Sequence, residues 1–257
     1  MELLNMFYWK QFFLVMVRIT AFLSAVSIFT SPSIPNKSKL IFSLLIAVVI
    51  FPFVDYKAWI IPTKMVILSV SFIKEILTGY IMGFVVNLIF MSIIIMGEVL
   101  GFQIGFTMAS MVDPMSNVNN NILTIFSLLL ATTIFIAING HYYFVWAIKE
   151  SFQYIPPGVS IVKIGSLNYI VFLIKKVFLL AIKIGAPGIA TVIAVDITLG
   201  LIGKVSPKIQ IIFVGFPLKI ALGLIALSFI FSISFGLWKN GVRDIPDVVS
   251  NLFLIMR

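Results

Sequence analysis

The side chains that could do chemistry are few in this sequence, and their spacing is not typical of an enzyme. The only histidine, His141, follows Asn139-Gly140, with no second histidine and no HExxH motif. Glu98 and Asp113 could act as a pair of carboxylates, but nothing near them in the sequence offers a nucleophile or a metal geometry. Asp113 stands before Pro114, where it is more simply a turn initiator. We therefore predict no catalytic residue, no metal site and no cofactor.

Several other functional classes lack their residues altogether. The chain has no cysteine, which excludes disulfides, thiolate chemistry and cysteine-based metal sites. It has no G-x-G-x-x-G motif and no P-loop, so nucleotide binding has no recognisable motif. The net charge of +9 comes from lysines scattered in and between apolar runs rather than from a basic tract. We expect these lysines at helix ends and membrane surfaces, and we expect no nucleic-acid partner.

Composition indicates an integral membrane protein or the apolar core of a large hydrophobic assembly. It is 61% hydrophobic and 11% charged, with a mean hydropathy of +1.18, whereas about a quarter of a soluble domain is charged. We predict an all-α polytopic membrane protein with about six apolar helical segments and a glycine-rich loop. The segments are residues 12–29, 40–54, 65–96, 122–138, 169–201 and 209–238.

Details of these segments give further expectations. The first is preceded by Glu2 and Lys10 and is not followed by a small-residue cleavage site, so we interpret it as a retained helix. Segment 40–54 is short for a span, which needs about 20 residues. Pro187 lies inside segment 169–201 and predicts a kink there.

Charged residues lie in or beside the apolar segments, which makes those segments poor lipid-facing helices. Each mid-bilayer charge costs about 2.5–3.5 kcal/mol on the insertion scale. We therefore expect helices that are buried against other subunits, or helices that do not truly cross the bilayer. The predicted interface charges are Arg18, Glu75, Lys176, Lys183, Asp196 and Lys219. A small-solute transporter using Lys176, Lys183 and Asp196 is the alternative, although the internal repeat typical of transporters is not evident.

The stretch 97–121 interrupts the apolar pattern with glycines at four-residue spacing. Gly97, Gly101 and Gly105 would line one helix face, as would Gly79 and Gly83 with Glu75. Such a face fits ordinary helix packing or packing around a closed pore. The methionines at 108, 111 and 115 fit either core filling or a deformable seal, and Asp113-Pro114 and the following asparagines fit a turn.

Taken in order, these residues resemble the FliR/SctT export-gate family of type III secretion systems, on its flagellar branch. The resemblance covers nearly the whole chain. Its points are Arg18, Pro32, Pro35 and Pro52; Glu75, Gly79 and Gly83; Gly97, Gly101, Gln103, Gly105, Phe106 and Asp113-Pro114; Gly140-His141, Ser151, Pro156 and Pro187; Asp196, Gly200 and Pro207; and 215–219, reading GFPLK. The family commonly has glutamine after the proline at 207, where this chain has Lys208.

The resemblance implies a protein-export subunit that is not an enzyme. It implies FliP- and FliQ-like partners in the gate, with FlhB- and FlhA-like proteins nearby and unfolded export substrates passing through. It implies a FliP-like part at 1–165 and a FliQ-like hairpin with a C-terminal tail at 166–257. It also implies a bacterial inner membrane location in the flagellar basal body. The loop 105–121 matches the family's pore plug, which gives as plug residues Gly105, Phe106, Met108, Met111, Asp113, Pro114, Met115, Asn117 and Asn119.

Overall fold

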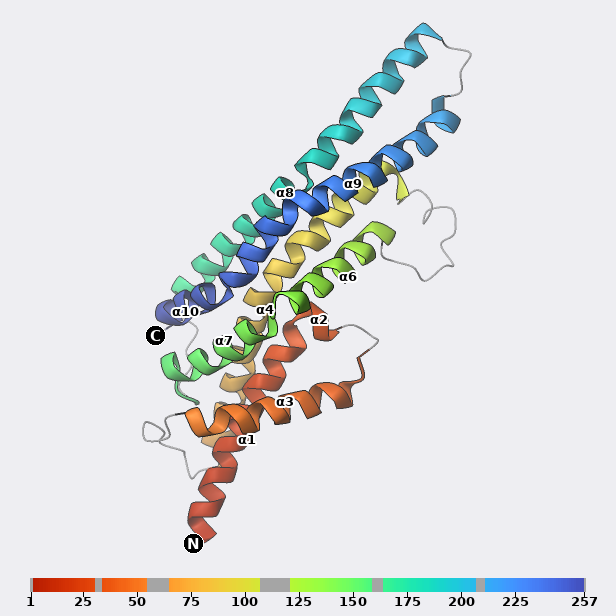
Figure 1. Cartoon of the computed structure of the whole chain (residues 1–257). Helices are drawn as coiled ribbons and strands as arrows, with labels where there is room; N and C mark the ends of the chain where they lie inside the picture. Colours follow the sequence, from red (N-terminus) through yellow and green to blue (C-terminus); the bar gives the residue numbers. More distant parts are fainter. Residues whose placement is uncertain are drawn as a thin grey trace. The chain divides into compact units, whose positions relative to one another are not determined.

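The computed structural model describes residues 2–30, 34–54, 65–106, 121–158, 164–206 and 211–256. These residues form helices, and the described part contains no strand (Figure 1), which confirms the predicted fold class. The elements are α1 (Glu2–Ala25), α2 (Ser27–Thr30), α3 (Asn36–Ile50), the 3₁₀ helix η1 (Phe51–Phe53), α4 (Met65–Ile104), α6 (Ile122–Ala137), α7 (His141–Tyr154), α8 (Ile164–Val205), α9 (Ile211–Arg243) and α10 (Ile245–Met256).

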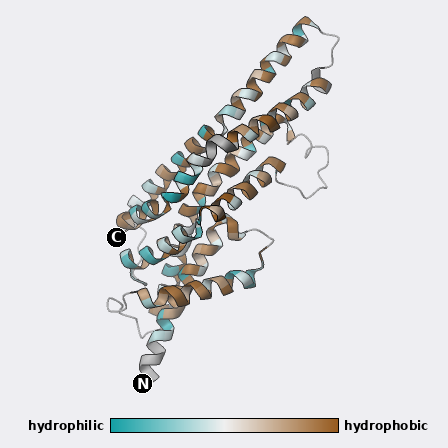
Figure 2. Cartoon of the chain, in the orientation of Figure 1, coloured by the Kyte–Doolittle hydropathy of each residue, from teal (hydrophilic) through white to brown (hydrophobic). Residues whose placement is uncertain are grey.

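Three helical stretches of the described chain are long and apolar enough to cross a membrane. They are Asn36–Phe53, Met65–Ile104 and Gly165–Val205, and a fourth span results if α6 and α7 count as one broken helix. Figure 2 shows the hydrophobic residues along these helices. At 40 residues, α4 is about 60 Å long, which is about twice the thickness of the hydrocarbon core. Its length therefore exceeds what one crossing requires.

The chain divides into two compact units. Unit 1 contains residues 1–89, 136–174 and 241–257, and unit 2 contains residues 90–135 and 175–240. Helices α4, α6, α8 and α9 each contribute a part to both units, although only the last two residues of α6 belong to unit 1. These units cut across the predicted division at residue 165, which concerns likeness to partner subunits and stays a prediction.

Unit 1 is built on α1, which packs against α3 and the first part of α4. Phe12 on α1 meets Phe51 edge to face with the ring centroids 5.4 Å apart, and Phe22 meets Phe144 of α7 at 5.6 Å. Helix α10 packs on α7. The α10 sequence places apolar residues at helical spacing, which explains why the tail forms an amphipathic helix. Its buried residues are Ile245, Val249, Leu252, Phe253 and Met256.

Unit 2 is built on the second part of α4. The Phe90 ring of α4 lies 5.4 Å from that of Phe135 on α6 and 5.5 Å from that of Trp238 on α9, measured between centroids. Gly188 of α8 lets Leu100 of α4 and Ile230 of α9 come close. The α4, α6, α8 and α9 segments of this unit therefore share one aromatic and aliphatic core.

Some helices differ in extent from the predicted segments. Helix α4 is one continuous element that ends at Ile104, so the first glycines of the stretch 97–121 are helical. Helix α8 continues through Pro187 and α9 through Pro217. Both prolines are exposed, and the kink expected at Pro187 stays a prediction.

Candidate functional site

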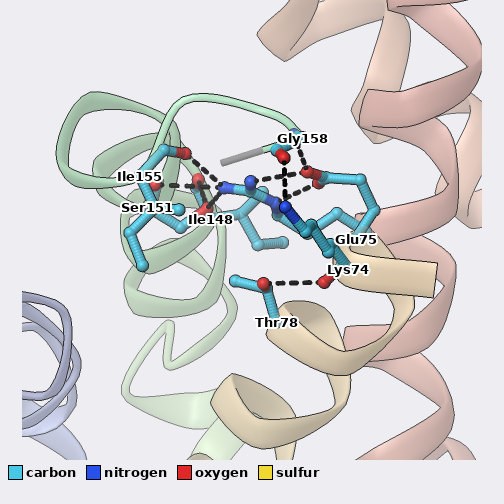
Figure 3. A network of polar contacts seen from close by, with 8 residues as sticks. Lys74, Glu75, Thr78, Ile148, Ser151, Ile155 and Gly158 are labelled. Carbon is cyan, nitrogen blue, oxygen red and sulfur yellow. Dashed lines mark hydrogen bonds and ion pairs between the residues drawn. The ribbon is translucent and has the colours of Figure 1, made fainter. Parts of the chain in front are cut away.

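A cluster of charged and polar groups lies in the interior of unit 1 (Figure 3). Arg18 of α1 and Glu75 of α4 are both 0% exposed. Arg18 Nε donates a hydrogen bond to Glu75 Oε2 at 2.6 Å, and Arg18 Nη2 donates one to Glu75 Oε1 at 3.1 Å. This two-point geometry matches the planar fork of a guanidinium to a carboxylate. Each charge therefore has the partner that burial requires.

Arg18 also reaches the carboxyl end of α7. Its Nη1 donates hydrogen bonds to the backbone oxygens of Ser151 and Ile155, both at 3.1 Å, and to Ser151 Oγ at 3.3 Å. The Ser151 oxygen also accepts the Ile155 N–H at 3.0 Å, so Arg18 adds a second donor to it. A cation is favoured at this end of the helix by the helix dipole. The Phe152 ring lies 4.3 Å from the guanidinium carbon. One side chain thus fixes the end of α7 against α1.

The turn that follows α7 is bound to α4 through both backbone groups of Gly158, its N–H and its oxygen. The Gly158 N–H donates to Glu75 Oε1 at 2.8 Å, and Lys74 Nζ donates to the Gly158 oxygen at 3.2 Å. Gly158 has a φ of 81°, in the left-handed region that favours glycine. A larger residue would strain the turn at the point where Glu75 binds it.

This network joins three helices and one turn, and its groups are arranged for stabilisation rather than for reaction. Removing one partner of a buried ion pair leaves an uncompensated charge and costs about 3–5 kcal/mol. The Ser151 hydroxyl donates to the Ile148 oxygen at 2.7 Å, and the Lys74 ammonium donates to the Gly158 oxygen. The described residues include no group of three His, Cys, Asp or Glu side chains that could hold a metal ion.

Gly79 and Gly83 place the backbone of α4 directly against α1. A Cβ at Gly79 would overlap the backbone oxygen of Arg18, and a Cβ at Gly83 would lie 2.5 Å from the backbone oxygen of Phe22. Both contacts are with backbone, which cannot move aside as a flexible side chain can. These two glycines therefore set the separation of the helices that carry Arg18 and Glu75.

The glycines of unit 2 bring α4 close to α6. A Cβ at Gly97 would lie 2.9 Å from Thr124 Cα, and a Cβ at Gly101 would overlap the Asn121 side chain. Thr124 Oγ1 donates a hydrogen bond to Glu98 Oε1 at 2.9 Å, which gives this charge a partner within the unit. The two glycines thus form the surface of α4 on which the start of α6 rests.

The described residues at the two ends of the stretch 105–121 are both anchored in unit 2. Gly105 ends α4 with a φ of 96°, and its Cβ would lie 2.8 Å from Cε1 of Phe216 on α9. Asn121 caps α6, because its Oδ1 accepts the Leu123 N–H at 3.0 Å. The Asn121 side chain lies against Gly101, one helical turn before Gly105. The chain therefore leaves the end of α4 and returns to that same turn.

A second ion pair joins α8 and α9 in unit 2. Lys219 and Asp196 are paired, and their side chains are 21% and 48% exposed. Lys176 and Lys183 are exposed on α8. The partly exposed Lys219–Asp196 ion pair contributes about 0–1 kcal/mol to stability, much less than the effect of breaking the buried pair of unit 1.

The comparison with protein families identifies the chain. The family described as "Bacterial export proteins, family 1" matches residues 9–245. The chain belongs to this family. It is a membrane protein of bacterial flagellar export, a structural or transport component.

Curated relatives of this export protein align with nearly its whole length. The flagellar biosynthetic protein FliR of Bacillus subtilis (strain 168) is 27% identical over 249 residues, which is 95% of each chain. FliR of Escherichia coli (strain K12) is 25% identical over 265 residues, covering 98% of this chain and 95% of the relative. FliR of Aquifex aeolicus (strain VF5) is 29% identical over 215 residues, covering 82% and 81%. These matches confirm the predicted resemblance to the FliR family.

One part of the predicted interface needs correction in this export protein. We predicted Arg18 and Glu75 as charges that face another subunit, whereas both are fully buried and bind each other. The cost of an unpaired charge in an apolar setting demands a partner, but that partner is in the same chain. Lys176, Lys183, Asp196 and Lys219 keep exposed surface, and their role at an interface stays a prediction.

The predicted plug lies mostly outside the described residues. Gly105 and Phe106 are described, and Phe106 is half-buried. The members outside the described residues are Met108, Met111, Asp113, Pro114, Met115, Asn117 and Asn119. Their role stays a prediction.

Sequence reasoning missed several members of the export protein's polar network. Gly158 and Lys74 both bind within this network, although the sequence alone assigned neither of them a role. Outside that network, in unit 2, Asn121 caps α6, whereas the sequence pattern grouped it with the asparagines of the stretch 97–121. The position of Asn121 just before an apolar run is a helix-start signal that could have found this cap.

Proposed function

We propose that this chain is a core subunit of the flagellar protein export gate. It assembles with FliP- and FliQ-like subunits into a channel for unfolded flagellar proteins, and its residues 105–121 close that channel. FlhA- and FlhB-like proteins are the expected neighbours, and the bacterial inner membrane within the basal body is the expected location. The observation that carries the proposal is the uncovered, charge-bearing surface of α8.

Helix α8 is poorly suited to a surrounding of lipid alone. Only 33% of its most apolar stretch is buried in the single chain. Its exposed surface carries Lys175, Lys183 and Asp196 among apolar side chains. Such a surface needs other protein helices or water beside it, because each charge is costly in hydrocarbon. A subunit assembly supplies that surrounding for the part of the helix that carries these charges.

The α8–α9 pair supports the proposed FliQ-like hairpin within 166–257. Gly188 of α8 lies against Ile230 of α9, and Asp196 of α8 pairs with Lys219 of α9. Two long helices joined in this way expose continuous apolar and charged surfaces along their outer sides. A repeating neighbour of similar build would cover them.

The anchored ends of the stretch 105–121 support its proposed role as a plug. Gly105 ends α4 and Asn121 rests on Gly101, so the intervening residues begin and end at one turn of α4. Methionines at 108, 111 and 115 supply unbranched side chains that adapt their shape to a closed pore. Attachment of both ends to one turn of α4 is what a plug belonging to this subunit would require.

The transporter alternative receives less support. It requires Asp196 to bind a solute together with Lys176 and Lys183, but the Asp196 carboxylate is already paired with Lys219. We therefore retain the export gate as the single proposed function.

Co-purification tests this proposal. A tagged chain is extracted in mild detergent from cells that make the FliP- and FliQ-like proteins, and native mass spectrometry measures the complex. We expect one copy of this chain with several copies of its partners. The charge reversal Lys183→Glu should reduce the yield of complex, whereas Lys204→Glu in the last turn of α8 serves as the matched control. A stable single chain that moves a small solute would contradict the proposal.

A further inference from the structure

An apolar groove runs along α1 in unit 1 and is bounded by α3 and α4. Its volume is about 480 Å³. The residues that define its walls are Phe13, Val17 and Ser24 of α1, Leu40 of α3, and Ile76 and Tyr80 of α4. All of these positions belong to one unit, so the groove is a property of that unit alone.

The two hydroxyl groups that α1 contributes to the groove donate to oxygens of their own helix. Thr20 Oγ1 donates to the Met16 oxygen at 2.8 Å, and Ser24 Oγ donates to the Thr20 oxygen at 2.8 Å. Neither of these two hydroxyl protons is therefore free for a ligand. The groove suits an apolar, flexible ligand that can adapt its shape to the groove.

The surface next to the groove has the character of a lipid-facing helix. From Leu40 to Phe53, every exposed side chain is apolar, and the one serine in this stretch, Ser43, is buried. The 18-residue stretch Asn36–Phe53 is about 27 Å long, close to the hydrocarbon thickness of about 30 Å. The exposed surface of α8 differs, because it carries Lys175, Lys183 and Asp196. Helix α3 is thus suited to lipid where α8 is suited to protein.

We propose that the groove binds an acyl chain of an anionic membrane phospholipid. Leu40 places one end of the groove beside the start of α3. Lys37 is exposed one helical turn before Leu40 and makes no ion pair with a described residue. The headgroup therefore lies at the Lys37 end, where a flexible ammonium group reaches the membrane surface, and the chain extends toward Phe13. This site is independent of the proposed gate function.

Fluorescence quenching by brominated lipids tests the site in the full chain. The absence of native cysteine permits single labelling sites at Ser24→Cys in the groove, Leu45→Cys on the exposed surface of α3 and Gln153→Cys on the exposed surface of α7. The labelled chain is reconstituted in vesicles, alone and with the FliP- and FliQ-like subunits. Phospholipid with brominated chains should quench the probes at 24 and 45, and should leave the probe at 153 largely unquenched.

Two substitutions separate specific binding from general contact with the membrane. Thr20→Phe fills the groove and should remove most quenching at 24 while leaving quenching at 45 unchanged. Thr133→Phe is the matched control, because Thr133 is an exposed threonine with the same hydrogen bond to the residue four positions earlier. Lys37→Gln should reduce the preference for brominated phosphatidylglycerol over phosphatidylcholine by about fivefold.

Three results would overturn the proposal. The first is quenching at 24 that Thr20→Phe does not change. The second is quenching at 24 that disappears when the partner subunits are added, which would make the groove a protein contact. The third is equal quenching by both headgroups in the unsubstituted chain. Assembly with partner subunits is measured separately by native mass spectrometry, so failure of the lipid site leaves the proposed function intact.

Discussion

The polar network of unit 1 and the glycine-lined face of α4 in unit 2 solve different physical problems. Around Arg18, the charged groups are buried and bound to partners at 2.6–3.3 Å. Where α6 packs against this face of α4, Asn121 Nδ2 and Ser127 Oγ are buried without a hydrogen-bond partner among the described residues. A fully paired network has one low-energy arrangement. The contact between α4 and α6 is less strongly stabilised, because two of its buried polar atoms lack a hydrogen bond.

This difference teaches where the chain is fixed and where it can change. The Arg18 network ties α1, α4 and α7 together, and breaking it costs a large share of a typical folding free energy. Among the described residues, the α4 face contacts the two ends of the stretch 105–121, at a left-handed glycine and a helix cap. We expect the first region to act as a scaffold and the second to permit movement.

The largest expected effect is the loss of one partner in the buried pair. Arg18→Met leaves Glu75 buried without its cation and should lower the free energy of unfolding by about 3–5 kcal/mol. Thermal unfolding in detergent, followed by resistance to protease, measures the change. The double variant Arg18→Met with Glu75→Leu should recover much of the stability, because no unpaired charge remains. Equal stability of Arg18→Met and the unsubstituted chain would contradict the scaffold role.

Crowding α1 against α4 should give the next largest effect. Gly79→Ala places a methyl group into the backbone of α1 and should destabilise unit 1 by about 1–3 kcal/mol. Gly200→Ala on α8 is the control, because no atom lies within 4 Å of its added Cβ. The control should be neutral or slightly stabilising, since alanine favours helix. The thermal midpoints of the two variants in detergent measure the difference. An equal shift in both midpoints would contradict the close contact between α1 and α4.

At the loop ends, substitution should alter closure more than folding. Gly105→Ala forces a non-glycine residue to a φ of 96° and should cost about 1–3 kcal/mol locally. Asn121→Ala removes the cap of α6 and should cost about 1 kcal/mol. Ion leakage through reconstituted gates, measured with a fluorescent dye in vesicles, should rise in both variants while the thermal midpoint moves little. A large fall in midpoint with unchanged leakage would mean that these residues serve folding alone.

The smallest expected effect concerns the exposed pair of unit 2. Lys219→Met should change stability by less than about 1 kcal/mol, because Asp196 is 48% exposed and water replaces its partner. Chemical unfolding with and without added salt measures this change. A loss comparable to that of Arg18→Met would remove the distinction between the two ion pairs.

Sequence patterns predicted the helices well but not their partners. Apolar runs and their breaks locate most of the described helices, because hydropathy and helical spacing are local properties. The burial cost of a charge predicts that Arg18 needs a partner. It does not identify Glu75, which is 57 positions away, since that contact depends on tertiary packing. Gly79 and Gly83 share a face by spacing alone, but only the structure places α1 on it.

The central claim is that residues 105–121 close a protein-conducting channel. The most direct test is the ion conductance of the purified assembly in planar bilayers, with and without residues 108–115. The account predicts a low conductance for the intact gate and a clear, sustained increase after the deletion, whereas leucine at 108, 111 and 115 should leave the gate closed. Conductance that remains at the intact level after the deletion, in an assembly of unchanged composition, would contradict the account.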